Sequence, residues 1–169
     1  DKAFALERAK KNNVNTFVIS HRNYSSQEKF DEALLSKLKE EKADLVVLAG
    51  FLSILGDTIT ANYKNRIINV HPSLIPSFCG PGYYGLRVHR EALKYGVKVT
   101  GATVHFVNGV VDGGAIILQK AVNIEEGDTP EILQKRVMEQ AEWKLLPRAV
   151  SLFCDGKLSI EDGKVKILD

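Results

Sequence analysis

Three patterns predict an α/β fold. Its sheet is mostly parallel and doubly wound (Rossmann-like), with an antiparallel strand at one side and a small C-terminal hairpin. Stretches with apolar residues at helical spacing alternate with short apolar runs over residues 4–70. The run "ADLVVLAGF", residues 43–51, is almost continuously apolar, which is typical of a strand covered by helices on both faces. Two β-rich runs, 98–107 and 115–124, are joined by "NGVVDGG" and indicate an antiparallel pair.

The first part of the chain predicts the helices and strands before that pair. Residues 1–13 have the spacing of an amphipathic helix, and residues 16–20 form a short β-rich run. Ser25 and Glu28 match a capping box, in which a hydroxyl and a carboxylate bind free N–H groups at a helix start. The run "RIINV", residues 66–70, predicts the next buried strand.

The second part predicts two helices and the closing hairpin. Apolar spacing favours a helix over residues 83–96. Asp128 and Glu131 form another capping pattern, with Pro130 in the first turn, where its missing N–H costs little. The final run "LSIEDGKVKIL", residues 158–168, predicts a small hairpin.

Length and composition indicate one globular domain, residues 1–169, and exclude several classes of partner. The chain has 44% hydrophobic and 26% charged residues, and it is long enough to bury a core. The net charge of +2 is too small to indicate nucleic acid, and no apolar run approaches the roughly 18 residues of a membrane span. Cys79 and Cys154 lack metal-type spacing, so we expect no metal site, reduced thiols and a cytoplasmic location.

Asn69 and His71 interrupt a buried strand near its end, and Pro72 prevents the strand from continuing. Residues two apart on a strand point to the same face, and ligands of open α/β sheets bind beyond the carboxyl ends of the strands. An amide N–H can stabilise a developing oxyanion, and an imidazole can move a proton near neutral pH. In the structural alternative, Asn69 caps a turn and His71 bonds a loop carbonyl. This stretch alone supports both interpretations equally.

Other polar residues have both a structural and a functional interpretation. His105, in the middle of "TVHFV", is expected to be buried and to form a hydrogen bond behind a site. Asp112, before two glycines, is either a turn residue or a carboxylate that raises the pKa of a nearby histidine. The run "LAGFLSIL", residues 48–55, either closes the core or forms an apolar slot for a flat heterocycle. His21 and His89 are predicted to lie on the surface.

Four motifs, taken in order, identify a family. The stretches "LAGFLSIL", "INVHPSLIPSF", "GVKVTGATVHFV" and "VVDGGAIILQ" closely resemble the phosphoribosylglycinamide formyltransferase family, and the resemblance covers nearly the whole chain. Asn-x-His-Pro-Ser-Leu-x-Pro is shared by the wider formyl-folate transferases, whereas "VTGATVHFV" is narrower. The resemblance implies transfer of a formyl group from 10-formyltetrahydrofolate to the amine of glycinamide ribonucleotide, in purine biosynthesis.

The resemblance also implies roles for individual residues. Asn69, His71 and Asp112 match the catalytic residues of the family. Segments on two loops, together with Asn69, match the positions that bind the folate: Leu52, Ser53, Ile54, Leu55, Asn108, Gly109, Val110 and Val111. Glu142 matches a residue that contacts the ribose of the nucleotide, although the local helix differs by one residue in length from some relatives.

His105 and Ser73 are expected to support the catalytic residues. Gln27 stands where some relatives carry a basic residue near the end of the folate. The chain also departs from the family at its start, where we expect a missing N-terminal strand and the loop that holds the nucleotide phosphate.

Two alternatives to the transferase follow from these departures. One is a 10-formyltetrahydrofolate hydrolase, in which water replaces the amine. The other is a non-catalytic folate-binding fragment. The expected state is a monomer or a homodimer.

Overall fold

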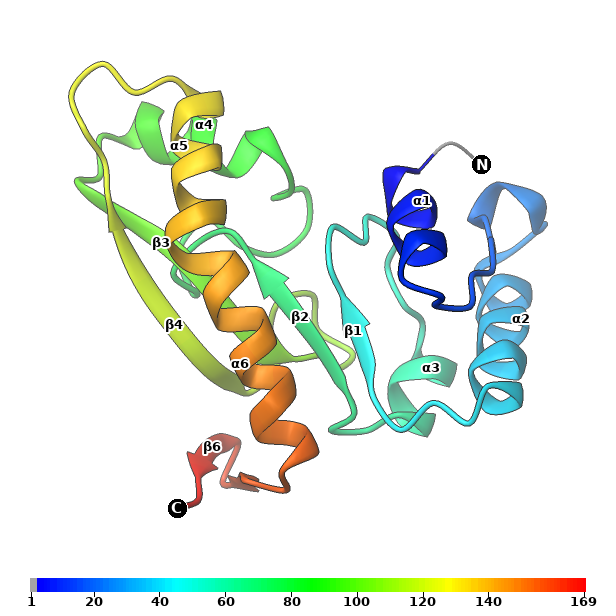
Figure 1. Cartoon of the computed structure of the whole chain (residues 1–169). Helices are drawn as coiled ribbons and strands as arrows, with labels where there is room; N and C mark the ends of the chain where they lie inside the picture. The colour runs from blue at the N-terminus through cyan, green and yellow to red at the C-terminus, as the bar shows by residue number, and fades with distance from the viewer. Residues whose placement is uncertain (1–2) are drawn as a thin grey trace.

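The central feature of the computed structural model, which describes residues 3–169, is a four-stranded sheet in the order β1–β2–β3–β4 (Figure 1). The strands are β1 (Val46–Leu48), β2 (Ile67–His71), β3 (Val99–Phe106) and β4 (Ile116–Asn123). β1 and β2 are parallel, whereas β3 runs antiparallel to both β2 and β4. The predicted α/β class and its antiparallel side are confirmed, and the described sheet is mixed.

Helices cover both faces of this sheet. One face carries α5 (Pro130–Val137), the π-helix η2 (Met138–Glu142) and α6 (Trp143–Cys154), which form one long rod in Figure 1. The other face carries α2 (Gln27–Glu40) and α3 (Asp57–Asn62), which pack together against β1 and the start of β2. Each face therefore has its own apolar cluster, as a doubly wound arrangement requires.

Strand β2 divides its side chains between these two layers, because successive residues of a strand point to opposite faces. Ile68 and Val70 pack into the cluster formed with α5 and α6. Ile67 packs into the cluster formed with α3. Asn69 and His71 follow Ile67 on the same face, but neither belongs to that cluster. The end of β2 thus presents polar side chains beside an apolar layer.

Two helices are capped one residue later than the sequence patterns predict. The cap of α2 is Ser26 rather than Ser25, and its Oγ accepts a hydrogen bond of 3.4 Å from an N–H of the first turn. The cap of α5 is Thr129, whose Oγ1 accepts a similar bond of 3.3 Å. Asp128 instead accepts a hydrogen bond of 2.7 Å from Arg136. At both sites two adjacent residues have side chains that can cap a helix, and in the structure the second of the two takes the cap position.

The predicted strand at residues 16–20 is wrong, because the segment has no regular secondary structure. No strand among residues 3–169 lies beside it to share backbone hydrogen bonds. The helix predicted before it forms as α1 (Phe4–Lys11), and the short 3₁₀-helix η1 (His21–Asn23) follows it. A β-rich composition alone therefore did not produce a strand here.

The remaining elements follow the predicted pattern. Helix α4 (Leu86–Tyr95) ends at Gly96, whose φ of 83° lies in the left-handed region that favours glycine. Strands β5 (Leu158–Glu161) and β6 (Lys164–Ile167) pair as the predicted C-terminal hairpin near the end of α6 (Figure 1). Within residues 3–169, no helix combines the length and the apolar character needed to cross a bilayer.

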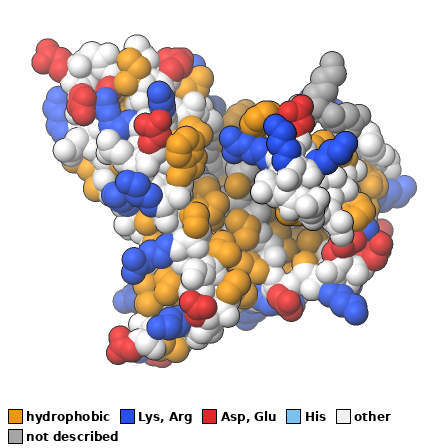
Figure 2. All heavy atoms as spheres, in the orientation of Figure 1, with side chains coloured by type: hydrophobic (Ala, Val, Ile, Leu, Met, Phe, Trp, Pro, Cys, Tyr) orange, Lys and Arg blue, Asp and Glu red, His pale blue; other side chains and the backbone are white. Residues whose placement is uncertain are grey.

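Among residues 3–169, strand β1 has a neighbouring strand on one side only, so its other edge carries backbone groups without a strand partner there. Figure 2 shows a recess, containing hydrophobic side chains, between the part of the molecule with α1 and α2 and the part with α5 and α6. Val47 of β1 is 39% exposed, although the sequence predicts a strand covered on both faces. Phe17 and Val18 are also about half exposed. This side of the described sheet therefore leaves apolar surface uncovered.

Candidate functional site

Asn69 and His105 face each other across the antiparallel strands β2 and β3. His105 is buried, and its Nδ1 lies 2.8 Å from the carbonyl oxygen of Phe106, which can only accept a hydrogen bond. In the neutral imidazole Nδ1 therefore carries the proton, and Nε2 accepts from the amide N–H of Asn69 at 3.2 Å. The second amide N–H of Asn69 has no protein acceptor within residues 3–169, so it can bind an oxygen of a substrate.

His71 lies two residues further along the same face and is 4% exposed. Its Nε2 donates to the carbonyl oxygen of Phe78 at 2.9 Å, and its Nδ1 lies 3.5 Å from Oδ2 of Asp112. Burial lowers the pKa of His71, while the Phe78 carbonyl and the charge of Asp112 oppose this shift. A proton accepted at Nδ1 would therefore lie between the imidazole and the carboxylate.

Asp112 reaches this face from the loop between β3 and β4. Its φ of 55° lies in the left-handed region, which aspartate and asparagine tolerate better than most residues. The backbone N–H of Gly80 donates to Oδ2 at 2.9 Å, and Oδ1 lies 3.6 Å from Nε2 of His105. Burial alone would raise the pKa of Asp112, but its pKa is lowered because the charged forms of His105 and His71, together with the Gly80 N–H, favour the carboxylate.

Ser73 supports the turn that follows β2. Its hydroxyl donates to the carbonyl oxygen of Ser77 at 2.6 Å, and its own carbonyl accepts from Oγ1 of Thr103 at 2.7 Å. Gln119 of β4 also donates to Oγ1 of Thr103, at 2.9 Å. Strands β3 and β4 thus fix the turn that leads to Phe78, the residue whose carbonyl orients His71.

The structure brings Asn69, His71, His105 and Asp112 onto one face at the end of β2. Together they supply one free amide donor, two imidazoles and one carboxylate. Such a set can stabilise a developing negative charge and move a proton.

Comparison with known proteins assigns this arrangement to a family. The sequence model described as "Formyl transferase" matches residues 1–150. Over 161 residues the chain is 38% identical to phosphoribosylglycinamide formyltransferase of Escherichia coli, covering 95% of this chain and 73% of that protein. The chain belongs to the formyl transferase family.

Further relatives extend this assignment. The chain is 42% identical to part of the trifunctional purine biosynthetic protein adenosine-3 of Gallus gallus, and spans 16% of that protein's length. Glycinamide ribonucleotide transformylase 1 of Symbiobacterium toebii superposes with a TM-score of 0.93 at 43% identity, over all of this chain and 77% of that one. A formyltetrahydrofolate deformylase of Pseudomonas syringae shares the fold, with a TM-score of 0.81 at 24% identity over 97% of this chain and 53% of that one.

In this formyl transferase domain, the first predicted folate segment connects β1 to α3. Leu52 and Ile54 are 72% and 62% exposed, and Ser53 is half-buried. Leu55 instead belongs to the buried cluster with α3. The segment therefore presents two apolar side chains for contact, and Leu55 anchors it to the core.

The second predicted folate segment lies on the loop between β3 and β4. Val110 and Val111 are exposed, and Oδ1 of Asn108 accepts a hydrogen bond from the N–H of Val110 at 2.9 Å. Asn108 and Gly109 also line a pocket of about 500 Å³, whose other walls include Thr60 of α3 and residues of the C-terminal hairpin. This pocket contains none of the residues of the Asn69–Asp112 face.

Glu142 is the last residue of the π-helix η2, which packs on β3 and β4. Burial raises the pKa of its carboxyl group to about 6. Within residues 3–169, no hydrogen bond or ion pair joins Glu142 to the cluster around His71. The structure thus holds a partly desolvated carboxylate on a separate element.

Sequence reasoning missed three contributors. The carbonyl of Phe78 and the N–H of Gly80 are backbone groups, so residue type could not reveal them. His89 was predicted on the surface, which is wrong: it is fully buried on α4, and burial lowers its pKa to about 4, with a further effect of His71. His89 lies on the same helical face as Val88 and Ala92, which are both buried. This spacing was a partial signal that His89 would be buried as well.

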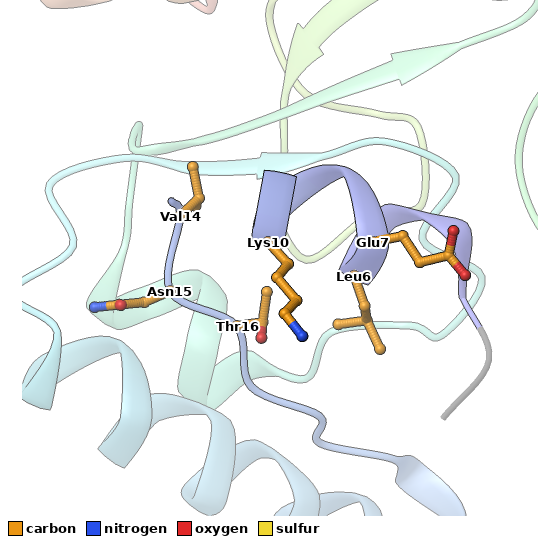
Figure 3. Close-up of a pocket in the computed structure, with 6 residues that line it drawn as sticks. All are labelled: Leu6, Glu7, Lys10, Val14, Asn15 and Thr16. Atoms are coloured by element: carbon orange, nitrogen blue, oxygen red, sulfur yellow. The ribbon is translucent and has the colours of Figure 1, made fainter. Parts of the chain in front are cut away.

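A second pocket lies far along the chain from these residues. Figure 3 shows that α1 and the segment after it form its wall, from Leu6 to Thr16, with the side chain of Lys10 between them. It contains none of the predicted site residues, so it does not contribute to the candidate active site.

Proposed function

We propose that this domain transfers a formyl group from 10-formyltetrahydrofolate to the amine of glycinamide ribonucleotide. The observation that carries the proposal is the free amide N–H of Asn69 beside the His71–Asp112 pair. Relatives named phosphoribosylglycinamide formyltransferase and glycinamide ribonucleotide transformylase support this choice of substrates.

The proposed reaction begins when the amine nitrogen attacks the formyl carbon, and the C=O π electrons move to the oxygen. The free N–H of Asn69 binds this oxyanion, and loss of one such donor typically lowers the rate by about 10²–10³. The amine then loses a proton, the folate N10 gains one, and the bond from carbon to N10 breaks. His71 accepts and returns that proton at Nδ1, while Asp112 stabilises the imidazolium, and such help is typically worth about 10²–10⁴.

The two substrates approach this face from different elements in the proposal. The exposed side chains of Leu52, Ile54, Val110 and Val111 contact the flat ring of the folate. Glu142 accepts hydrogen bonds from the ribose hydroxyls. These bonds compensate for the solvation that its carboxylate loses by partial burial.

We also propose that one further strand and a phosphate-binding loop belong beside β1. The support is the unpaired edge of β1 and the exposed apolar side chains of Phe17, Val18 and Val47. A strand placed there would bind the free backbone groups of β1 and cover apolar surface. The loop after such a strand would supply N–H groups for the nucleotide phosphate.

The decisive experiment measures loss of the formyl group from 10-formyltetrahydrofolate, with and without glycinamide ribonucleotide. It uses this chain and a chain extended at its N-terminus by a family strand and loop. Turnover that requires the nucleotide and is strongest in the extended chain supports both proposals. Formate release at the same rate without the nucleotide would identify a hydrolase and overturn the transferase proposal.

A further inference from the structure

One side chain ties the exposed apolar segment, residues 52–55, to helix α2. Nε2 of Gln27 donates a hydrogen bond to the carbonyl oxygen of Ile54 at 3.0 Å. Among residues 3–169, this is the one hydrogen bond that reaches a backbone group of the segment. Leu55 packs into the cluster with α3, but Leu52 and Ile54 are 72% and 62% exposed, so packing contributes little to the order of these two residues.

Gln27 is itself held in one orientation. Its Nε2 also donates to Oδ1 of Asp31 at 2.8 Å, and its Oε1 lies 3.1 Å from Nε2 of His21. Since the Ile54 carbonyl and the Asp31 carboxylate can only accept, the amide nitrogen must face both of them. Both amide hydrogens are therefore used within the chain, and neither remains for a ligand.

Asp31 lies against the residue that follows this segment. It is 2% exposed, although it is an acidic residue. Its second carboxylate oxygen packs against Gly56 at the start of α3, where a Cβ would overlap it. Gln27 thus bonds to the segment itself, and Asp31 packs against Gly56, which follows it.

We infer that Gln27 is a positioning residue for formyl-folate, which orders residues 52–55 before the co-substrate binds. This inference rests on the proposed function, in which Leu52 and Ile54 contact the folate ring. A segment that is already ordered loses less conformational entropy on binding. Loss of the Gln27 bond therefore weakens binding of formyl-folate, while the groups that perform the chemistry stay in place.

The test compares Gln27→Met, which removes the hydrogen bonds at similar length, with Gln27→Glu, which places a carboxylate against the Ile54 carbonyl and Asp31. The control is Lys29→Met, an exposed residue on the same helix. Calorimetry gives the Kd of 10-formyltetrahydrofolate, and steady-state kinetics give KM and kcat for both substrates.

For Gln27→Met we expect Kd and KM for formyl-folate to rise about tenfold, with kcat and KM for the nucleotide unchanged. Gln27→Glu has a larger effect, and Lys29→Met has none. An unchanged Kd in both Gln27 variants, or a loss of kcat without a change in KM, would overturn the inference. If the unaltered chain binds no formyl-folate at all, the proposed function fails first, and the two failures are thereby distinguished.

Discussion

The hydrogen bond between Asn69 and His105 determines what each side chain can do. Because Nδ1–H of the neutral His105 donates to the carbonyl oxygen of Phe106, its Nε2 faces the amide of Asn69 as an acceptor. The amide of Asn69 must then direct its nitrogen toward His105, which leaves one N–H free. In the proposed mechanism, His105 thus orients the amide whose free N–H binds the oxyanion.

Asp112→Asn is expected to lower turnover by about 10²–10⁴ while leaving the folded state intact. Asparagine removes the charge that stabilises the His71 imidazolium, but it tolerates the left-handed backbone at φ 55°. Initial rates and thermal unfolding measure the two effects. The matched control is Asp162→Asn, an exposed aspartate with φ 48°. Ordinary turnover in a well-folded Asp112→Asn protein would refute the proposed mechanism.

Glu142→Gln is expected to stabilise the protein at pH 7. Burial raises the pKa of this carboxyl group to about 6, above its ordinary value of 4.5. The folded state therefore loses stability as pH rises from 4.5 to 6, and the loss persists at pH 7. Replacing the acid by an amide should recover about 1–2 kcal/mol of the free energy of unfolding at pH 7.

Urea unfolding at pH 7 and at pH 4.5 checks this effect, since the gain should be much smaller at the lower pH. Glu139→Gln, an exposed residue of the same π-helix, is the control. Binding of glycinamide ribonucleotide should weaken in Glu142→Gln alone. An equal gain at both pH values would show that the carboxyl group is not the cause.

At the scale of elements, the β3–β4 connection depends on Gly114, where the backbone of β3 approaches closely. A Cβ at Gly114 would overlap the carbonyl oxygen of Phe106, whereas at Gly109 its nearest neighbour would be Asp57 at 3.5 Å. Gly114→Ala is therefore expected to destabilise the fold by about 1–3 kcal/mol. It should also lower turnover, because the same loop carries Asp112.

Thermal and urea unfolding of Gly114→Ala and Gly109→Ala test this difference. We expect a lower Tm for the first variant and little change for the second. Equal stability of the two variants would show that the β3–β4 loop can move to accommodate the Cβ without a loss of free energy of unfolding.

Local pattern was sufficient for elements whose partners are close in sequence. The runs 98–107 and 115–124 pair through a short loop, and both became strands. Residues 16–20 have a similar composition but no neighbouring strand among the described residues, and they remained irregular. Strand formation thus depended on a partner, which composition does not report.

In the candidate site too, local spacing predicted some features, whereas others depended on tertiary packing. The spacing of Asn69 and His71 predicted that they share a face, and register then placed His105 opposite Asn69. The approach of Phe78 and Gly80 depends on the path of a long turn, which residue types leave open. The burial of His89 depends on how α4 packs, and the polar character of histidine pointed the other way.

At the scale of the whole molecule, the buried side chain of His89 makes the free energy of unfolding depend on pH. It is fully buried, and neither ring nitrogen has a hydrogen-bond partner within residues 3–169. Its pKa is lowered to about 4, so between pH 6.5 and 4 the unfolded chain binds the proton more tightly. The free energy of unfolding should therefore fall by about 3 kcal/mol as pH drops through this range.

His89→Leu is expected to remove most of this acid sensitivity. Glu142 contributes with opposite sign between pH 6 and 4.5, so the comparison is clearest in a Glu142→Gln background. Urea unfolding at pH 7 and pH 4.5, with and without the His89 substitution, gives the difference. An unchanged pH dependence would show that the pKa of His89 does not differ between the folded and unfolded states, and that His89 is not the cause of the acid sensitivity.

The π-helix η2 lets the long helix keep one buried face. Buried residues recur at every fourth position through it: Leu133, Val137, Ala141, Leu145 and Ala149. In an uninterrupted α-helix such a stripe would drift by about 40° at each step, or about 160° in all. The wider π-turn between Met138 and Glu142 absorbs much of that drift. Deleting one residue at this point would convert the π-turn into an ordinary α-helical turn, so we expect the chain to tolerate a one-residue change of length here better than elsewhere in the same helix.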